Sequence, residues 1–428
     1  MKRPVFALID CNNFFVSCER IFRPDLENKP VVVLSSNDGC MVARSNEAKA
    51  LGLPMAAPAF KYRQILKANS VVEFSANFEL YGDISRRITD ILTSLTPRIE
   101  VYSVDESFLD LSELNIPDFA AWGKMVRQTI LRWVGIPVSI GIAPTKTLAK
   151  LASERAKKDP GLGGVLNMVD LPRRELQHQL QAVDIKDIWG IGWGLAPKLR
   201  AEGIMNAYDF VQLKPRHAQQ LMGIHGRQLT AELGGLSCYP LEMENKRRQS
   251  IARTRTFGEN TNDLGSIEAA ITTFATQAAF RLRVSGQVTR RAAIFLATSK
   301  HKPGYQRWTQ ELFYRVPTAD TGQLISTLLE ELGKIYSPEQ HYARAGVFLW
   351  DFMPASNLQT DLLGTVDIAH ETRAMSRMKT IDSVNERYGK ETIHYASQDL
   401  GNHWQPRYNL RSPRYTTKTN ELPFVTPI

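Results

Sequence analysis

The feature that most restricts the fold is an alternation of short apolar runs with segments of helical spacing, because each pattern can bury its side chains in only a few ways. Residues 5–9 and 31–34 are short apolar runs of strand-forming composition, and residues 12–22 between them favour a helix. We therefore expect the chain to open with a β-α-β unit.

The alternation continues through the next hundred residues. The expected elements are helices at 76–95, 119–134 and 145–158, a strand at 137–142, and a hairpin of strands at 100–104 and 107–111. Asp105 and Glu106 lie near the tip of this hairpin. Strands that alternate with helices and include a hairpin indicate an α+β sheet with helices packed on one face.

The length of 428 residues exceeds what one hydrophobic core normally supports, so we expect several domains. The Gly-rich residues 161–164 are a natural joint, and the basic residues 246–248 suggest a linker. Short helices are expected at 171–236, and residues 249–350 return to strands and helices. Residues 351–428 are polar and are expected to be irregular.

The balance of charge is basic, with 53 Lys and Arg against 44 Asp and Glu, which favours a polyanionic partner without establishing one. The cysteines Cys11, Cys18, Cys40 and Cys238 have neither zinc-ligand spacing nor a disulfide pattern. The first apolar run is too short for a signal peptide, and no run is long enough to span a bilayer. We expect a cytoplasmic protein with no membrane contact.

Three carboxylates fall where strands are expected to end. Asp10 follows the first apolar run, and Asp105 and Glu106 lie between the hairpin strands. If these strands are neighbours, the carboxylates converge and their charge requires cations, of which Mg²⁺ suits oxygen ligands and phosphates. Two such ions about 3.5–4 Å apart would support nucleotidyl transfer. The alternative is that Asp10 merely ends a strand and the acidic pair is a solvated turn, which is commonplace.

The sequence around these carboxylates resembles the signature blocks of the Y-family DNA polymerases, in the family's order. The matching blocks are residues 5–19 (VFALIDCNNFFVSCE), 42–52 (VARSNEAKALG), 102–110 (YSVDESFLD) and 141–152 (GIAPTKTLAKLA). Shorter segments at 22–26, 29–34, 37–40, 187–192 and 412–417 resemble the UmuC branch of the family in particular. The resemblance spans nearly the whole chain.

This resemblance implies a template-directed DNA polymerase for error-prone translesion synthesis in the SOS response to DNA damage. It implies a right-hand architecture with a ferredoxin-like palm, small fingers, a helical thumb with a helix-hairpin-helix, an α/β little finger and an irregular C-terminal tail. The implied boundaries are 1–18 and 76–165 for the palm, 19–75 for the fingers, 166–240 for the thumb, 246–352 for the little finger and 353–428 for the tail.

The resemblance also implies roles for single residues. Asp10, Asp105 and Glu106 would be the catalytic ligands of two Mg²⁺ ions, joined by the backbone carbonyl of Cys11, whereas Asp110 would be structural. Phe15 occupies the position of the steric gate, the aromatic ring that excludes ribonucleotides by filling the space of the 2′-hydroxyl.

Three basic residues match phosphate-contacting positions of the family or lie near them. Lys49 and Lys157 match such positions, and Arg44 is a weaker candidate. Taken alone, each of these residues is more often a solvated surface charge. Lys49 stands where many relatives have Arg, so a point charge would replace a bidentate grip. Phe14, next to the gate, is expected in the core.

Primer-template DNA is the implied polyanion. Gly190, Gly192 and Gly194 resemble the hairpin of a helix-hairpin-helix, in which exposed N–H groups bind phosphate. Arginines are dense from residue 247 onward, and Arg247, Arg253 and Arg255 are the candidates for backbone contact. The alternatives are a plain glycine turn and arginines that only solvate a surface.

Gln359, Leu362 and Leu363 resemble the motif that binds the bacterial β sliding clamp. The alternative is that the two leucines pack onto the preceding domain. By resemblance, members of the UmuC class also work with a dimer of a cleaved UmuD-type protein and with a RecA-type recombinase filament.

Two other functions use similar features. An adenylyl or guanylyl cyclase has a palm-like sheet and two-metal chemistry but needs no basic domain after it. A non-catalytic DNA-binding scaffold could keep the fold without needing the three carboxylates.

Overall fold

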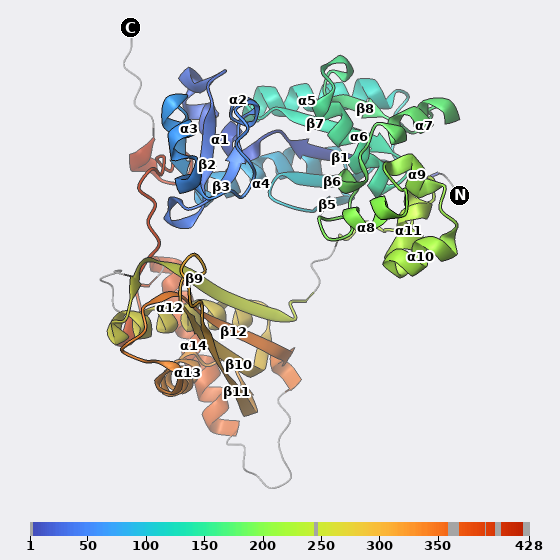
Figure 1. Ribbon diagram of the computed structural model, residues 1–428. Coiled ribbons are helices and arrows are strands. Elements are labelled where there is room, and N and C mark those ends of the chain that lie inside the picture. Colours follow the sequence, from blue (N-terminus) through green and yellow to red (C-terminus); the bar gives the residue numbers. More distant parts are fainter. Residues whose placement is uncertain (1–2, 244–246, 358–367, 390, 399–403, 423–428) are drawn as a thin grey trace. The chain divides into compact units, whose positions relative to one another are not determined.

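The computed structural model describes residues 3–243, 247–357, 368–389, 391–398 and 404–422, and it divides into two compact units (Figure 1). The first unit comprises Met1–Ser35, Gly39–Asn245 and Leu410–Ile428. The second unit comprises Ser36–Asp38 and Lys246–Asn409. The boundary after Asn245 coincides with the basic linker expected at 246–248.

A five-stranded sheet forms the centre of the first unit, in the order β5-β6-β1-β7-β8. Its strands are β1 (Phe6–Cys11), β5 (Ile99–Val101), β6 (Glu106–Asp110), β7 (Val138–Ala143) and β8 (Val165–Asn167). The central strand β1 is antiparallel to both neighbours, and all its residues are buried. Because β8 pairs with β7, the sheet continues past the glycine-rich joint expected at 161–164.

Helices cover both faces of this sheet. The helices are α4 (Phe78–Leu95), α5 (Phe119–Val134) and α6 (Lys146–Lys158). Ala7 and Ile9 of β1 share a core with α4 and α5, whereas Leu8 shares a core with α6. At Gly141 of β7, an added Cβ would lie 2.1 Å from the carbonyl oxygen of Ala149 in α6. The expectation of helices on one face is therefore wrong, because β1 is apolar on both sides.

The first unit also contains a separate three-stranded sheet, in the order β3-β2-β4. Its elements are β2 (Val31–Leu34), β3 (Met41–Arg44), β4 (Val72–Ser75), α1 (Phe14–Phe22), α2 (Asn46–Ala50) and α3 (Arg63–Ala68). Strand β2 pairs with β3 and β4 and not with β1. The β-α-β opening is therefore wrong, since α1 carries the chain from one sheet to another.

Short helices follow, as expected from the glycine-punctuated sequence. They are α7 (Arg173–Gln181), α8 (Ala196–Ala201), α9 (Ala207–Val211), α10 (Pro215–Met222) and α11 (Ile224–Leu233). Their apolar side chains share one core with α6 and with Leu8 of β1.

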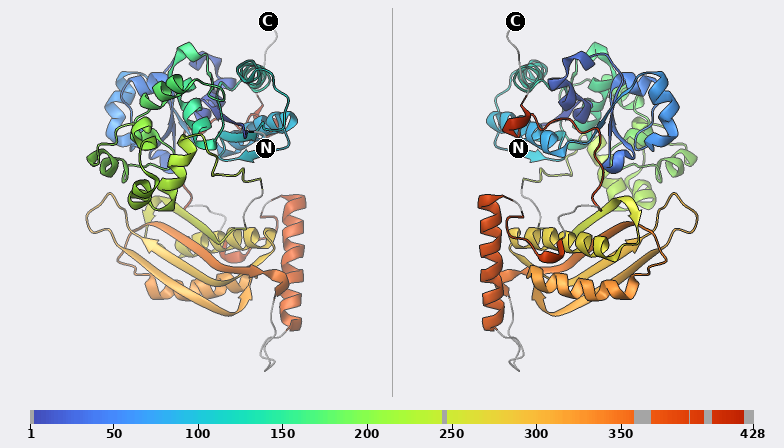
Figure 2. Two further views of the ribbon diagram at one scale, coloured as in Figure 1. Left: turned by 90° about the vertical axis from the view of Figure 1, so that its right-hand side faces the viewer. Right: turned by 90° about the vertical axis from the view of Figure 1, so that its left-hand side faces the viewer.

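The second unit contains a four-stranded antiparallel sheet in the order β11-β10-β12-β9, with α12 and α13 on one face (Figure 2). Its elements are β9 (Ser250–Thr261), α12 (Leu264–Val284), β10 (Gln287–Ala297), β11 (Arg307–Thr318), α13 (Thr321–Ile335) and β12 (Tyr342–Pro354). These strands and helices agree with the expectation for residues 249–350.

The expected irregular tail is wrong for part of the segment after Pro354. Residues Ile368–Tyr388 form the helix α14. Asp382 accepts two hydrogen bonds of 2.7 Å from Arg283 of α12, and Arg377 pairs with Asp320 at 2.6 Å. Buried Met378 adds an apolar contact. Arg283, which lies in the arginine-dense part of the sequence after residue 247, thus anchors α14.

Candidate active site

The pairing of β1 with β6 brings the predicted carboxylates together. Asp10 lies directly opposite Glu106 in the antiparallel register, and the backbone N–H of Cys11 donates to the carbonyl of Asp105 at 2.8 Å. The Ser103 hydroxyl donates to Asp105 at 2.6 Å and accepts the N–H of Glu106 at 3.0 Å. The expected convergence of the two sheet edges is confirmed.

Two lysines of α6 face these carboxylates. Lys157 Nζ lies 2.7 Å from Asp10 Oδ1, and Lys150 Nζ lies 2.5 Å from Glu106 Oε1. Lys150 was not among the predicted residues. It precedes Lys157 by about two helical turns, so it shares a helix face with a predicted residue, and that spacing could have identified it.

The electrostatics show a site that concentrates negative charge. Burial raises the pKa of Asp10 to about 6, and the neighbouring charges of Glu106 and Asp105 add to the rise while Lys157 opposes it. Among the described residues, no three acidic, His or Cys side chains already surround a common metal position. The acidic donors still suit a hard divalent cation, and the Lys157 ammonium now balances the buried Asp10 carboxylate.

Asp110 lies at the other end of β6, opposite Phe6. It pairs with Arg98 at 2.8 Å, and its carboxylate also accepts the N–H of Ser112 at 2.9 Å. The expectation that Asp110 is structural agrees with these contacts.

The two adjacent phenylalanines at the start of α1 have different surroundings. Phe14 is only 3% exposed and belongs to the core, as expected. Phe15 is partly exposed, and its ring stacks on the Tyr81 ring with centroids 4.5 Å apart and planes 13° apart. Phe78 meets the Phe15 ring edge-on at 5.9 Å.

The three predicted phosphate-binding cations lie near one another. Burial lowers the pKa of Lys49, and the positive charges of Lys157 and Arg44 lower it further. Lys49 Nζ donates to Asn13 Oδ1 at 2.6 Å, whereas the Arg44 guanidinium donates to the carbonyl of Leu53. Burial also lowers the pKa of Arg44. The site therefore combines an acidic edge with a nearby cluster of cations.

The glycine hairpin lies directly before α8. Gly190 has a φ of +87°, which favours glycine, and the carbonyl of Gly192 accepts N–H groups of Leu195 and Ala196 at 3.0 Å. Trp189 connects this glycine hairpin to the strand hairpin of β5 and β6. Its indole N–H donates a hydrogen bond to the Tyr102 hydroxyl at 3.1 Å. An added Cβ at Gly192 or Gly194 would meet open space.

In the second unit, cations gather on β9 and on the sheet face turned away from α12 and α13. Arg253 is half-buried on β9; burial lowers its pKa, and Arg281, Arg255 and Arg248 lower it further. Arg247 and Arg255 are exposed.

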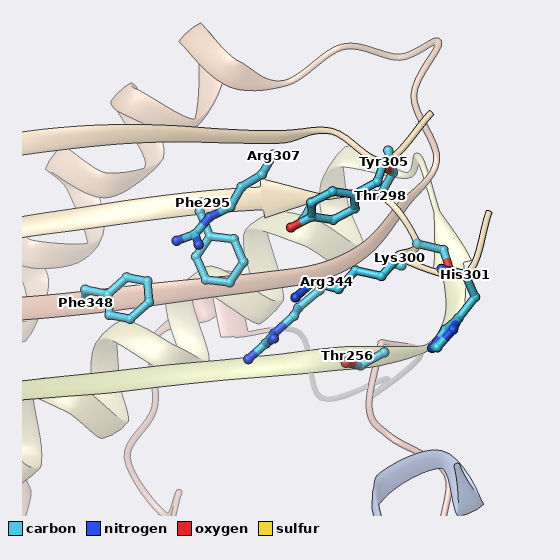
Figure 3. A pocket seen from close by; sticks show the side chains of 12 residues that line it. Thr256, Phe295, Thr298, Lys300, His301, Tyr305, Arg307, Arg344 and Phe348 are labelled. Atoms are coloured by element: carbon cyan, nitrogen blue, oxygen red, sulfur yellow. The ribbon is translucent and has the colours of Figure 1, made fainter. Parts of the chain in front are cut away.

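The helix-free sheet face has its own aromatic and basic surface. Arg307 lies over the Phe295 ring at 4.4 Å, and Arg344 and Phe348 line the same hollow (Figure 3). These residues were not predicted from sequence, although alternate positions along expected strands could have placed them on one face.

Comparison with known proteins identifies the family. The impB/mucB/samB family matches residues 9–154, and the C-terminal domain of that family matches residues 248–362. The chain is 36% identical to protein UmuC of Salmonella typhimurium, over 98% of this chain and 99% of the relative. Protein ImpB of the same species is 36% identical with the same coverage. The chain belongs to the impB/mucB/samB family.

Solved structures connect this impB/mucB/samB protein to the Y-family polymerases. A Y-family DNA polymerase chimera of Dbh and Dpo4 is 25% identical, covers 82% of this chain and 99% of its own, and gives a TM-score of 0.63. The protein is thus a Y-family DNA polymerase of the UmuC type, an enzyme of translesion DNA synthesis that acts on primer-template DNA and dNTPs. Y-family polymerases generally use a divalent metal. This assignment decides against a cyclase and against a non-catalytic scaffold.

Two further findings concern the C-terminal part of the chain. A domain of unknown function matches residues 377–425. The predicted clamp-binding residues Gln359, Leu362 and Leu363 lie outside the described residues. Within the described part of the chain, no helix is both long and apolar enough to cross a membrane.

Proposed function

We propose that Asp10, Asp105 and Glu106, with the backbone carbonyl of Cys11, hold two Mg²⁺ ions for nucleotidyl transfer from a dNTP to a primer 3′-hydroxyl. The observation that supports this most strongly is the register of Asp10 opposite Glu106, with each carboxylate paired to a lysine of α6. When bound, the ions would lower the charge on the attacking oxygen and stabilise the leaving pyrophosphate.

The side chains of the pocket then divide the work of holding the nucleotide. Lys49, Lys157 and Arg44 would bind the triphosphate, with Lys157 exchanging Asp10 for a phosphate oxygen. Phe15, supported from behind by Tyr81, would fill the space of a 2′-hydroxyl. Lys150 would hold Glu106 in place until the cations arrive.

The remaining elements are proposed to grip DNA. The five-stranded sheet, the residues around β2 and the helices α7–α11 would serve as palm, fingers and thumb, and the β9–β12 sheet as little finger. Gly190, Gly192 and Gly194 would approach the sugar-phosphate backbone closely, and Arg247, Arg253 and Arg255 would contact phosphates.

Primer extension by the purified protein with Mg²⁺ tests this function. Extension of the primer by template-complementary nucleotides, lost with a chelator and restored by added Mg²⁺, is the expected result. Binding of primer-template without any extension would overturn the proposed chemistry.

The arginine assignment predicts a change in salt dependence. Arg253→Ala and Arg255→Ala should each weaken DNA binding similarly on unrelated sequences and reduce the slope of log affinity against log salt by about 1, because each removes one phosphate contact. Fluorescence anisotropy over a salt series measures this. Arg373→Ala, at an exposed position of α14, is the control and should keep the wild-type slope. An unchanged slope in both β9 variants would refute the assignment.

A partner is proposed for the segment that follows β12. Replacing Gln359, Leu362 and Leu363 with Ala should abolish stimulation by the β sliding clamp, because the leucines would enter its hydrophobic groove and the tether would raise the effective concentration of enzyme at the primer end. Synthesis is measured with and without clamp. Replacing Thr360 and Asp361 with Ala is the control, and clamp stimulation undiminished in the triple variant would exclude this contact.

The proposed assembly also includes a cleaved UmuD-type dimer and a RecA-type filament. The support is the identity to protein UmuC over nearly the full length.

A further inference from the structure

The chain returns to the first unit at its end, through residues 410–422, here termed the C-terminal strap. Leu410 and Ser75 exchange hydrogen bonds: the Ser75 N–H donates to the Leu410 carbonyl at 3.1 Å, and the Leu410 N–H donates to the Ser75 hydroxyl at 2.9 Å. Tyr415 stacks on Phe22 with centroids 4.3 Å apart. In Figure 1 the strap is the red segment at the left of the first unit.

The strap holds the start of α4. The side-chain amide of Asn77 donates to the carbonyls of Ser412 and Pro413 at 3.1 Å and to the Ser412 hydroxyl at 3.0 Å. The other end of the same amide caps α4, since its oxygen accepts the N–H of Leu80 at 3.4 Å. The first turn of α4 therefore depends on strap residues for its position.

A buried carboxylate connects the strap to an aromatic ring. Glu19 is fully buried, and its Oε1 accepts the Tyr81 hydroxyl at 2.6 Å and the Ser412 hydroxyl at 3.0 Å. Burial raises the pKa of Glu19, and these two hydrogen bonds oppose the rise. The other oxygen, Oε2, has no partner among the described residues. The Tyr81 and Ser412 hydroxyls thus each donate one of the two described side-chain hydrogen bonds to the Glu19 carboxylate.

The ring of Tyr81 lies directly behind the proposed sugar pocket. It is 1% exposed and stacks face to face on Phe15, so a shift of Tyr81 moves the surface against which Phe15 rests. The chain of contacts is continuous from Ser412 through Glu19 and Tyr81 to Phe15.

We propose that the C-terminal strap positions the sugar-discriminating pocket, with Ser412 and Glu19 fixing Tyr81 as the support of Phe15. This inference rests on the proposed role of Phe15 as the steric gate. It gives a role to part of the segment matched by a domain of unknown function. Ser412, Glu19 and Tyr81 are positioning residues, because they act through Phe15.

The physical reason is the free-energy cost of removing a hydrogen-bond donor from the buried Glu19 carboxylate. Without the Ser412 hydroxyl, buried Glu19 keeps one hydrogen bond, and it regains another only if the groups around it shift. Without the Tyr81 hydroxyl, the ring keeps its stacking but loses the contact that fixes its position over Phe15. Either loss loosens the pocket wall without removing a group that touches the nucleotide.

The test measures kcat/KM for a dNTP and for the matching ribonucleotide on the same preparation of full-length protein. Ser412→Ala and Tyr81→Phe should each lower the ratio of the two values about threefold to tenfold, the size of one hydrogen bond. Ser412→Thr keeps the hydroxyl and should restore the ratio. Lys418→Ala, which breaks only an ion pair with Glu421 inside the strap, should retain the wild-type ratio.

A purely structural strap would give another result. Loss of folded protein lowers both values equally and cancels in the ratio. An unchanged ratio in Ser412→Ala and Tyr81→Phe, alongside a reduced ratio in Phe15→Ala, overturns the inference and leaves the proposed pocket intact. An unchanged ratio in Phe15→Ala overturns the pocket itself, and the inference with it.

Discussion

Replacing Asp105 with Asn or Glu106 with Gln is expected to slow primer extension by at least about 1,000-fold while DNA affinity changes little. Each change removes a negative charge where a cation would bind, and neither touches the arginines of β9. Glu106 lies opposite Asp10 at the sheet edge, and its replacement by Gln also removes the negative charge that Lys150 now pairs with. Single-turnover extension measures the rate, and a gel-shift titration measures the affinity.

The same strand provides a matched control. Asp110 is also a buried carboxylate of β6, but it pairs with Arg98 at the far end. Asp110→Asn should lower stability and leave the rate of extension per folded molecule close to that of the wild type. Extension at the wild-type rate in Asp105→Asn or Glu106→Gln would contradict the two-metal assignment.

Local patterns were sufficient to place most elements of the fold, whereas the acidic part of the site was predicted through the resemblance to the Y-family signature blocks. Helix α5 has the expected bounds of 119–134, because its apolar spacing starts after the capping residue Asp118 and ends at Gly135. The pairing of Asp10 with Glu106 could be stated in advance only on the condition that their strands are neighbours, and the resemblance to the family supported that condition. The helix bounds, by contrast, depended on residues close in sequence.

Contacts between distant residues were not available from local patterns. The run 31–34 is a fully buried strand, yet nothing in its four residues says which sheet it joins. The polar segment after β12 gave no strong apolar periodicity, so α14 was missed; tertiary anchors such as Arg283 with Asp382 stabilise it. The hydrogen bond from Ser412 to Glu19 joins residues 393 positions apart. Residues 412–417 were recognised only as a resemblance to the UmuC branch.

Replacing Phe15 with Ala is expected to lower discrimination against ribonucleotides roughly 100-fold, since the proposed gate acts by steric exclusion of one hydroxyl. The change opens space at the face of the Tyr81 ring that Phe15 now covers in stacking contact. Incorporation of each dNTP should continue, because the carboxylates and the lysines remain. The ratio of kcat/KM for deoxyribonucleotide and ribonucleotide measures the effect.

The neighbouring ring separates this effect from a general loss of packing. Phe14 is 3% exposed within the core of the first unit, so Phe14→Ala should lower the free energy of unfolding by roughly 3–5 kcal/mol. The ribonucleotide ratio of the remaining folded enzyme should stay close to the wild-type value, because Phe14 lies in the core and Phe15 is the ring proposed to face the sugar. If instead Phe14→Ala and Phe15→Ala relax the ratio equally, selection depends on the packing of α1 as a whole, and Phe15 is not the gate.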